Sequence, residues 1–373
     1  MSETDFSTSP TPTPPPLLHC DYSDWSPSFS IIPSVYLLAF LVGCLSNSLV
    51  LWAYLDRAEG RRTRDKKLAG AGHLALADLC FLVTLPLWAV YTALGYHWPF
   101  GQPLCQISSF LTALNMYASV FSLSMLSVER YWVLTGRRHS SHHAPQSCSS
   151  RAMRILGGVW VLAGVLALPG LLLRSDDWHL ELADSTSIFL SCQMDYSMLI
   201  GAEVEEAEKE RAEMWWSAAL SLKSTLIGFL LPLVILLVCY CSLAQLLNRH
   251  FGRGPRPDRR RQRRLLRVIV TLVMAFFLCW LPLHVNKTVS LLLELGLVPY
   301  SCSLDQILLA AHPYVTCLAY LNSCLNPVLY AACDPTFRKR CRGALLIPNK
   351  MDFHHLGPLS VVENKNCIRC QYF

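Results

Sequence analysis

Several polar side chains stand where the surrounding sequence is apolar enough to lie in a membrane. Asp78 interrupts an apolar run, and Asn115 and Ser119 belong to a small polar island among Leu, Val, Phe and Met. A carboxylate near the middle of a membrane costs about 2.5 to 3.5 kcal/mol, so Asp78 must face a polar interior. This residue fits a cation or proton site, and the alternative is an Asp held by waters and neighbouring hydroxyls.

A second charged group ends the apolar stretch that runs from Cys105 to Glu129-Arg130-Tyr131. At about 1.5 Å per residue such a helix is roughly 38 Å long, slightly more than the ~30 Å hydrocarbon core. A tilted helix therefore places Cys105 at one water boundary and Arg130 at the other. This stretch is predicted to link the two faces of a membrane protein.

Motifs of other chemistries are missing from the sequence. It contains neither His-Glu-x-x-His nor Gly-x-Ser-x-Gly, and no internal repeat of the kind found in transporters. The last apolar segment, 306–332, lacks the lysine that a retinal Schiff base requires. We therefore expect neither an enzyme nor a photoreceptor, with no nucleic-acid partner and no cofactor besides an allosteric sodium ion.

The elements that carry these groups are predicted to be membrane helices. The 373 residues are 53% hydrophobic and 16% charged, and the mean hydropathy is +0.33. Helices satisfy their own backbone polar groups in lipid, so each long apolar segment is interpreted as a helix. We predict an all-α membrane protein, a seven-transmembrane helix bundle over 31–332 with a short amphipathic eighth helix. The spans are expected at about 31–54, 68–93, 104–133, 152–173, 215–247, 265–293 and 306–332.

The charges predict how the bundle lies in the plasma membrane. Of the 32 Lys and Arg residues, 24 fall in the connections 55–67, 134–151 and 248–264 or after 332, which the positive-inside rule places in the cytoplasm. The N-terminal arm, 1–30, is then extracellular. The outer segments hold 17 of the 26 acidic residues, and an acidic face steers basic ligands, although it is also what a merely solvated loop requires.

Cysteines and basic residues mark further features. The outer cysteines, Cys20, Cys105, Cys192 and Cys302, allow three disulfide pairings, and the sequence does not choose among them. The run 259–264, rich in Arg, suits lipid phosphates or a docked cytosolic protein. An interfacial amphipathic helix is expected at 334–346, where Cys341 is a candidate for palmitoylation, followed by a cytoplasmic tail, 347–373.

Together these features resemble the rhodopsin-like G-protein-coupled receptors. The matching residues fall in order on seven predicted spans. They are Asn47, the run Leu74-Ala75-Leu76-Ala77-Asp78, Cys105 with Cys192, Glu129-Arg130-Tyr131, Trp160, Pro232 with Tyr240, Cys279-Trp280-Leu281-Pro282 and Asn326-Pro327-Val328-Leu329-Tyr330.

Within that family the chain is similar to the apelin group of peptide receptors. The similarity rests on stretches such as Cys20-Asp21-Tyr22-Ser23-Asp24-Trp25, Thr84-Leu85-Pro86-Leu87-Trp88, Trp98-Pro99-Phe100-Gly101, 115–121 and Met194-Asp195-Tyr196-Ser197-Met198. The chain departs from the group at Gly95 and His97, where the group has acidic residues, and at His312, where it has an aromatic one. It also carries an acidic insertion at 203–213.

The resemblance implies roles for particular residues. It implies disulfides between Cys105 and Cys192 and between Cys20 and Cys302. It implies ligand contacts from Asp21, Asp24, Tyr36, Trp88, Arg174, Lys287, Asp305 and Tyr320. It implies a sodium site of Asp78, Asn115, Ser119, Asn322, Ser323 and Asn326. It implies an activation switch of Glu129, Arg130, Tyr131, Tyr240, Trp280, Pro282, Asn326, Pro327 and Tyr330.

Alternative roles exist for some of these residues. Tyr36 and Tyr320 also suit simple helix packing, and Arg174 and Lys287 suit snorkelling to the membrane interface. The implied function is a receptor for an extracellular basic peptide, apelin or Elabela, acting through a heterotrimeric G protein of the inhibitory class. The alternatives are a peptide-scavenging receptor without G-protein signalling and a receptor for a chemokine-like or orphan ligand. The hydroxyl-poor tail leaves arrestin recruitment open.

Overall fold

The computed structural model describes residues 28–60, 66–134, 146–176, 190–201, 204–250, 256–333 and 338. Helices dominate this part of the chain, with one two-stranded sheet. The helices are α1 (Ser28–Gly60), α2 (Lys66–Leu82), α3 (Leu85–Ala93), α4 (Gln102–Leu134), α5 (Gln146–Leu172), α6 (Ser197–Ile200), α7 (Glu206–Thr225), the π-helix η1 (Leu226–Leu230), α8 (Leu231–His250), α9 (Arg256–Glu294) and α10 (Cys302–Cys333). The strands are β1 (Arg174–Ser175) and β2 (Gln193–Met194).

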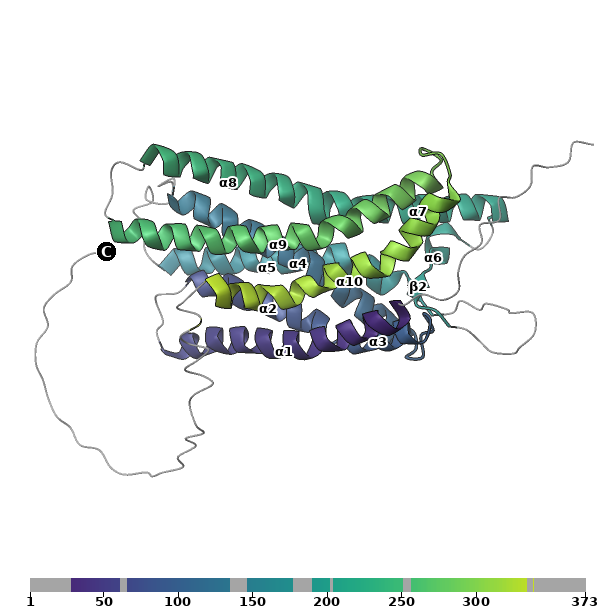
Figure 1. Ribbon diagram of the computed structural model, residues 1–373, viewed down its shortest axis with the longest axis horizontal. Helices are drawn as coiled ribbons and strands as arrows, with labels where there is room; N and C mark the ends of the chain where they lie inside the picture. The colour runs from purple at the N-terminus through teal and green to yellow at the C-terminus, as the bar shows by residue number, and fades with distance from the viewer. Residues whose placement is uncertain are drawn as a thin grey trace, which may run out of the picture.

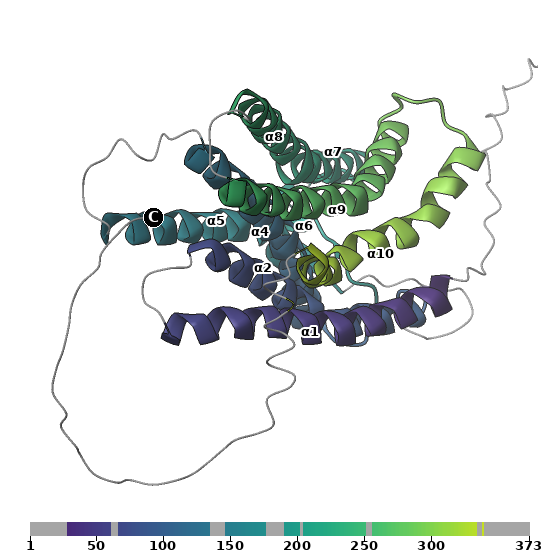
Figure 2. The same ribbon diagram turned by 60° about the vertical axis from the view of Figure 1, so that its left-hand side comes forward.

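The predicted seven-helix membrane bundle is confirmed. Seven helical segments of the described chain are long and apolar enough to cross a membrane. Figures 1 and 2 show them running side by side along the long axis of the molecule. Large apolar side chains such as Leu41, Val161 and Leu278 are more than 60% exposed, which suits a surface that faces lipid.

Helix α4 lies at the centre of the bundle. It contacts α2, α5, α8 and α9, whereas α1 packs on α2, α3 and α10. In both ribbon views α1 and α8 lie on opposite sides of the bundle (Figures 1 and 2). Tyr117 and Val120 of α4 are fully buried in the largest apolar cluster, together with Phe276 of α9. The stretch from Cys105 to Tyr131 therefore touches most of the other spans.

Two spans are irregular near a proline. The second is divided between α2 and α3, and the Thr84 hydroxyl donates to the Phe81 carbonyl at 2.7 Å just before Pro86. The fifth changes to a π-turn immediately before Pro232, where the Leu231 amide bonds the Leu226 carbonyl. Proline removes one helical amide donor, and the altered turns accommodate that loss.

Among the helices, α7 and α9 begin furthest before the predicted spans. α7 begins at Glu206 rather than near 215, so most of the acidic insertion forms the first turns of the fifth span. Acidic Glu206 and Glu208 in that first turn favour a helix N-terminus. α9 begins at Arg256 and so takes in the arginine-rich run. The predicted N-terminal arm up to residue 27, the tail and, apart from Arg338, the expected amphipathic helix with Cys341 lie outside the described residues.

Candidate functional site

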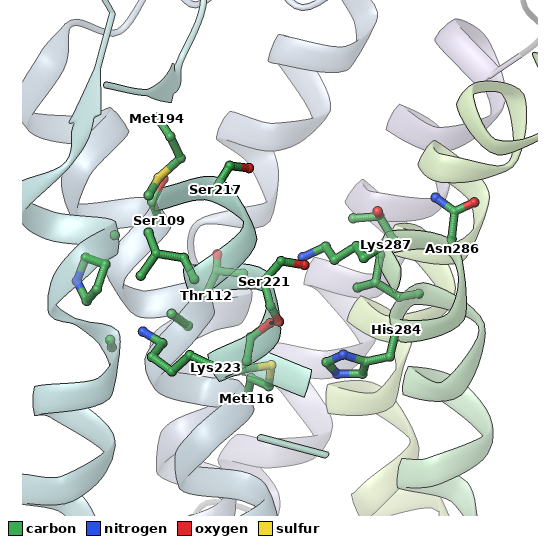
Figure 3. Close-up of a pocket in the computed structure, with 18 of the residues that line it drawn as sticks. Ser109, Thr112, Met116, Met194, Ser217, Ser221, Lys223, His284, Asn286 and Lys287 are labelled. Atoms are coloured by element: carbon green, nitrogen blue, oxygen red, sulfur yellow. Dashed lines mark hydrogen bonds between the residues drawn. The ribbon is translucent and has the colours of Figure 1, made fainter. Parts of the chain in front are cut away.

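A cavity of about 490 Å³ opens between the helices at the end of the bundle that carries the β1–β2 sheet. Its walls come from α3, α4, α5, both strands, α7, α9 and α10. Figure 3 shows serine, lysine and histidine side chains around it, together with the thioether of Met116. The volume and the mixture of apolar walls with a few polar groups suit a ligand site.

The two strands border the cavity and are linked to α4 by a disulfide and a hydrogen bond. A disulfide joins Cys105 at the start of α4 to Cys192 beside β2, which confirms the expected pairing. Arg174 pairs with Met194 in the antiparallel sheet, and its Nη1 donates to the Cys192 carbonyl at 2.8 Å. The amide of Gln106 donates to the Arg174 carbonyl at 3.1 Å. Disulfide and hydrogen bonds together hold Arg174 at the cavity wall.

Burial shifts the pKa of two groups in and beside the two strands. It lowers the pKa of the Arg174 guanidinium from its ordinary value, although nearby tyrosines oppose the shift. It raises the pKa of the Tyr196 phenol, and Glu213 and Glu294 add to that rise. The Nε of Arg174 is buried without a hydrogen-bond partner among the described residues. Arg174 is therefore a desolvated cation with hydrogen-bonding capacity to spare.

Lys287 approaches the same cavity from α9. Figure 3 shows its amino group pointing towards Ser221 of α7. His312 of α10 also lines the wall, and its Nδ1 lies 3.3 Å from the amide nitrogen of Asn286. Arg174 and Lys287 thus bring two positive charges to one cavity, which suits an anionic group such as a carboxylate.

The predicted aromatic residues form one side of the site. Trp88 and Tyr320 line the cavity. Tyr36 is buried and packs on Tyr320 with a centroid distance of 5.6 Å, and Phe81 meets the same ring at 5.0 Å. Tyr36 therefore supports Tyr320 by helix packing, whereas Tyr320 faces the cavity.

Trp280 and His284 lie at the deep end of the cavity. Trp280 stacks on Phe276, and His284 lies 4.8 Å from the ring of Phe229. The hydroxyl of Thr225, next to the π-turn, is 3.1 Å from His284 Nδ1. Because Pro282 lies between Trp280 and His284, ligand contacts at this depth act close to the proline of α9.

Asp78 lies beneath the cavity in an enclosed polar cluster. Its two carboxylate oxygens accept hydrogen bonds of 2.9 Å from the amides of Asn115 and Asn326. Ser323 donates to Asn115 Oδ1 at 3.2 Å, and its carbonyl accepts a bond of 3.0 Å from Asn47. The cluster joins α1, α2, α4 and α10.

Two further members of the predicted sodium site lie beside this cluster with unused oxygens. Ser119 Oγ and Asn322 Oδ1 are buried and have no hydrogen-bond partner among the described residues. A hard cation prefers oxygen ligands of this kind, so the donor set fits the ion.

Fewer of the predicted switch residues have described side chains. The hydroxyl of Tyr240 lies 2.8 Å from Ser127 Oγ and joins α8 to α4. Tyr131 is half-buried and Pro327 is buried. The side chains of Glu129, Arg130 and Tyr330 lie outside the described part.

Of the remaining predicted ligand contacts, Asp305 is described, and it does not line the cavity. Asp305, in the first turn of α10, accepts a hydrogen bond of 3.2 Å from the Tyr300 hydroxyl. Asp21 and Asp24 lie outside the described residues. Cys302 is in a disulfide, and its predicted partner, Cys20, also lies outside them.

The structure adds cavity residues that sequence reasoning missed. Lys223, His284 and Glu294 all line the cavity. A signal existed for Lys223, since a lysine inside an apolar span is unusual enough to mark a functional position. His97, one of the departures from the apelin group, contacts the segment before β2. Its side-chain Nδ1 accepts a hydrogen bond of 3.2 Å from the backbone amide of Leu190.

Comparison with known proteins agrees with this architecture. The family model described as 7 transmembrane receptor (rhodopsin family) matches residues 46–330. Apelin receptor B of Danio rerio is 44% identical over 346 residues, covering 93% of this chain and 90% of the relative. The apelin receptor of Xenopus tropicalis is 40% identical and covers 91% and 90%. The type-1 angiotensin II receptor of Bos taurus is 33% identical and covers 83% and 79%.

Proposed function

Because the chain belongs to the rhodopsin family of seven-transmembrane receptors, which signal rather than catalyse reactions, we propose that it is a receptor for an extracellular basic peptide of the apelin or Elabela kind. Apelin receptors are similar to it over most of its length. It acts through a heterotrimeric G protein of the inhibitory class.

The observation that carries the proposal is the cavity with Arg174 and Lys287 on its walls and Trp88 and Tyr320 beside them. A peptide end offers a carboxylate for the two cations and apolar side chains for the rings. Glu294 at the last turn of α9 lines the same cavity and is exposed. This carboxylate suits a basic residue nearer the peptide's middle.

The charge distribution supports the proposed orientation. With the N-terminus outside, the cavity and the acidic first turns of α7 face the extracellular solution. An acidic surface raises the local concentration of a basic peptide and speeds its encounter. The peptide's basic body is thus steered by the outer surface, while its carboxylate end enters the basic cavity.

Signalling requires that the peptide bind one bundle state more tightly than another. In our proposal the ligand acts on Trp280 and Pro282, and the sixth span then opens at its cytoplasmic end. The switch residues rearrange at that end to admit the G protein; they are Arg130, Tyr240, Tyr330 and the segment around Pro327. The hydrogen bond of 2.8 Å between Tyr240 and Ser127 is present in this structure, and we expect it to change when the sixth span opens.

The resting state is proposed to hold a sodium ion among Asp78, Asn115, Ser119, Asn322, Ser323 and Asn326. The oxygens of Ser119 and Asn322, which have no hydrogen-bond partner in the described part of the chain, support this site. When bound, the ion supplies a positive charge that offsets the buried carboxylate of Asp78. Sodium chloride should raise the melting temperature of the purified receptor more than choline chloride does, and Asp78→Asn should remove the difference.

The test of the function is cyclic-AMP inhibition in cells that express the full chain, challenged with apelin and Elabela peptides. Inhibition by either peptide that is lost in Arg130→Ala supports the proposal. Peptide binding without any response identifies a scavenging receptor instead. Absence of binding by both peptides rejects this ligand class and directs attention to chemokine-like and orphan ligands, with Gly95, His97 and His312 as the relevant departures.

A further inference from the structure

Lys223 places a third positive charge in the cavity, away from Arg174 and Lys287. It lies on α7, within the fifth membrane span, and is half-buried. Figure 3 shows it across the cavity from Lys287, which enters from α9. The cavity therefore has cations on two of its sides.

The immediate surroundings of Lys223 satisfy only part of its ammonium group. Its Nζ donates one hydrogen bond of 2.9 Å to the Leu166 carbonyl of α5 and lies 5.9 Å from the centroid of the Tyr117 ring. A lysine ammonium has three donors, so two remain without a partner among the described residues. Within the described part of the chain no carboxylate lies at ion-pair distance from it.

A cation inside a membrane span is costly, and such residues pair or bind a ligand. Here the backbone carbonyl and the aromatic face hold the ammonium in place without neutralising it. The free donors lie on the wall of a cavity large enough for the end of a peptide. The surroundings of Lys223 therefore lack an anion, and the cavity has room for one.

We propose that Lys223 forms a second anion subsite, which selects ligands whose buried end carries an acidic side chain as well as a terminal carboxylate. The inference rests on the proposal that this cavity binds an extracellular ligand. It deepens that proposal, because Arg174 and Lys287 hold the terminal carboxylate and Lys223 holds the second negative group. A charge-assisted hydrogen bond of this kind is worth roughly tenfold or more in affinity.

The experiment measures binding of two short probes to the purified full-length chain, from the rise in its melting temperature with probe concentration. N-acetyl-Phe-Glu carries two carboxylates, and N-acetyl-Phe-Gln is its isosteric twin with one. The variants are Lys223→Met, which keeps the apolar stem, and Lys223→Arg, which keeps the charge. Lys209→Met is the matched control, since Lys209 lies on the same helix and contacts Glu206 at 3.8 Å.

The expected result is about tenfold tighter binding of the Glu probe than the Gln probe to the wild type, Lys223→Arg and Lys209→Met. The ratio should fall to about one in Lys223→Met. Equal binding of both probes to the wild type overturns the proposal, and so does a preference that survives in Lys223→Met. A preference that depends on Lys223 in a receptor that fails to respond to apelin or Elabela would retain the subsite and reject only the proposed peptide.

Discussion

Asp78 and Lys223 are both charged groups inside membrane spans, but their surroundings differ. The Asp78 carboxylate is fully buried, and each of its oxygens accepts an amide hydrogen bond from another helix. Lys223 is half-buried and has one backbone carbonyl as its hydrogen-bond partner among the described residues. A charge whose partners come from several helices joins those helices, whereas a charge with free donors beside a cavity is suited to a ligand.

The largest effect is expected from Asp78→Ala. This change removes the acceptor of two hydrogen bonds and leaves the Asn115 and Asn326 amides buried without a partner. We expect a loss of about 3 kcal/mol in the free energy of unfolding, measured by thermal melting of the purified receptor. Asp78→Asn retains an acceptor and should lose less than half as much. An unchanged melting temperature in Asp78→Ala would show that the cluster does not join the helices.

Lys287→Met tests the ligand side of the comparison. Removing one of the two cations assigned to a terminal carboxylate should weaken peptide binding about 30-fold, which corresponds to about 2 kcal/mol. Competition binding of an apelin peptide to membranes measures this effect. A C-terminally amidated peptide serves as control, because it lacks the carboxylate and should bind the wild type and Lys287→Met alike. Equal affinity of the acid peptide for both receptors would contradict this assignment.

Lys223→Met should cost little stability, in contrast with Asp78→Ala. It removes one hydrogen bond to the Leu166 carbonyl but also removes a cation from a membrane span. We expect the free energy of unfolding without ligand to change by less than about 1 kcal/mol, as measured by thermal melting. A loss as large as that of Asp78→Ala would mean that Lys223 is primarily a structural residue.

Lys209→Met is expected to have the smallest effect on stability. Lys209 and Glu206 form an exposed ion pair at 3.8 Å on the first turns of α7. Such exposed pairs contribute little to stability, so the free energy of unfolding, measured by thermal melting, should change by less than about 0.5 kcal/mol. The change should be still smaller at high salt. A shift above 1 kcal/mol would indicate that the acidic turns of α7 contact another part of the receptor.

Sequence reasoning predicted the bundle and part of the cavity. Trp88, Arg174, Lys287 and Tyr320 were expected at a ligand site, and all four line the cavity. The helix that carries the fifth span begins earlier than the predicted span, because the acidic residues before Trp215 suggested a loop. Glu206 and Glu208 are compatible with a helix that extends beyond the membrane, where water solvates the charges.

The amino-acid sequence by itself determined the class of protein, because hydropathy and charge asymmetry are properties of local segments and specify seven spans. It also determined the chemical types at key positions, such as Asp78 in an apolar run. Only the tertiary structure decided which of these groups meet. Lys223 and Arg174 come from different elements, and their shared cavity depends on how α4, α5, α7 and α9 pack. Whether a charge finds partners or faces a cavity is a property of that packing, and no local pattern encodes it.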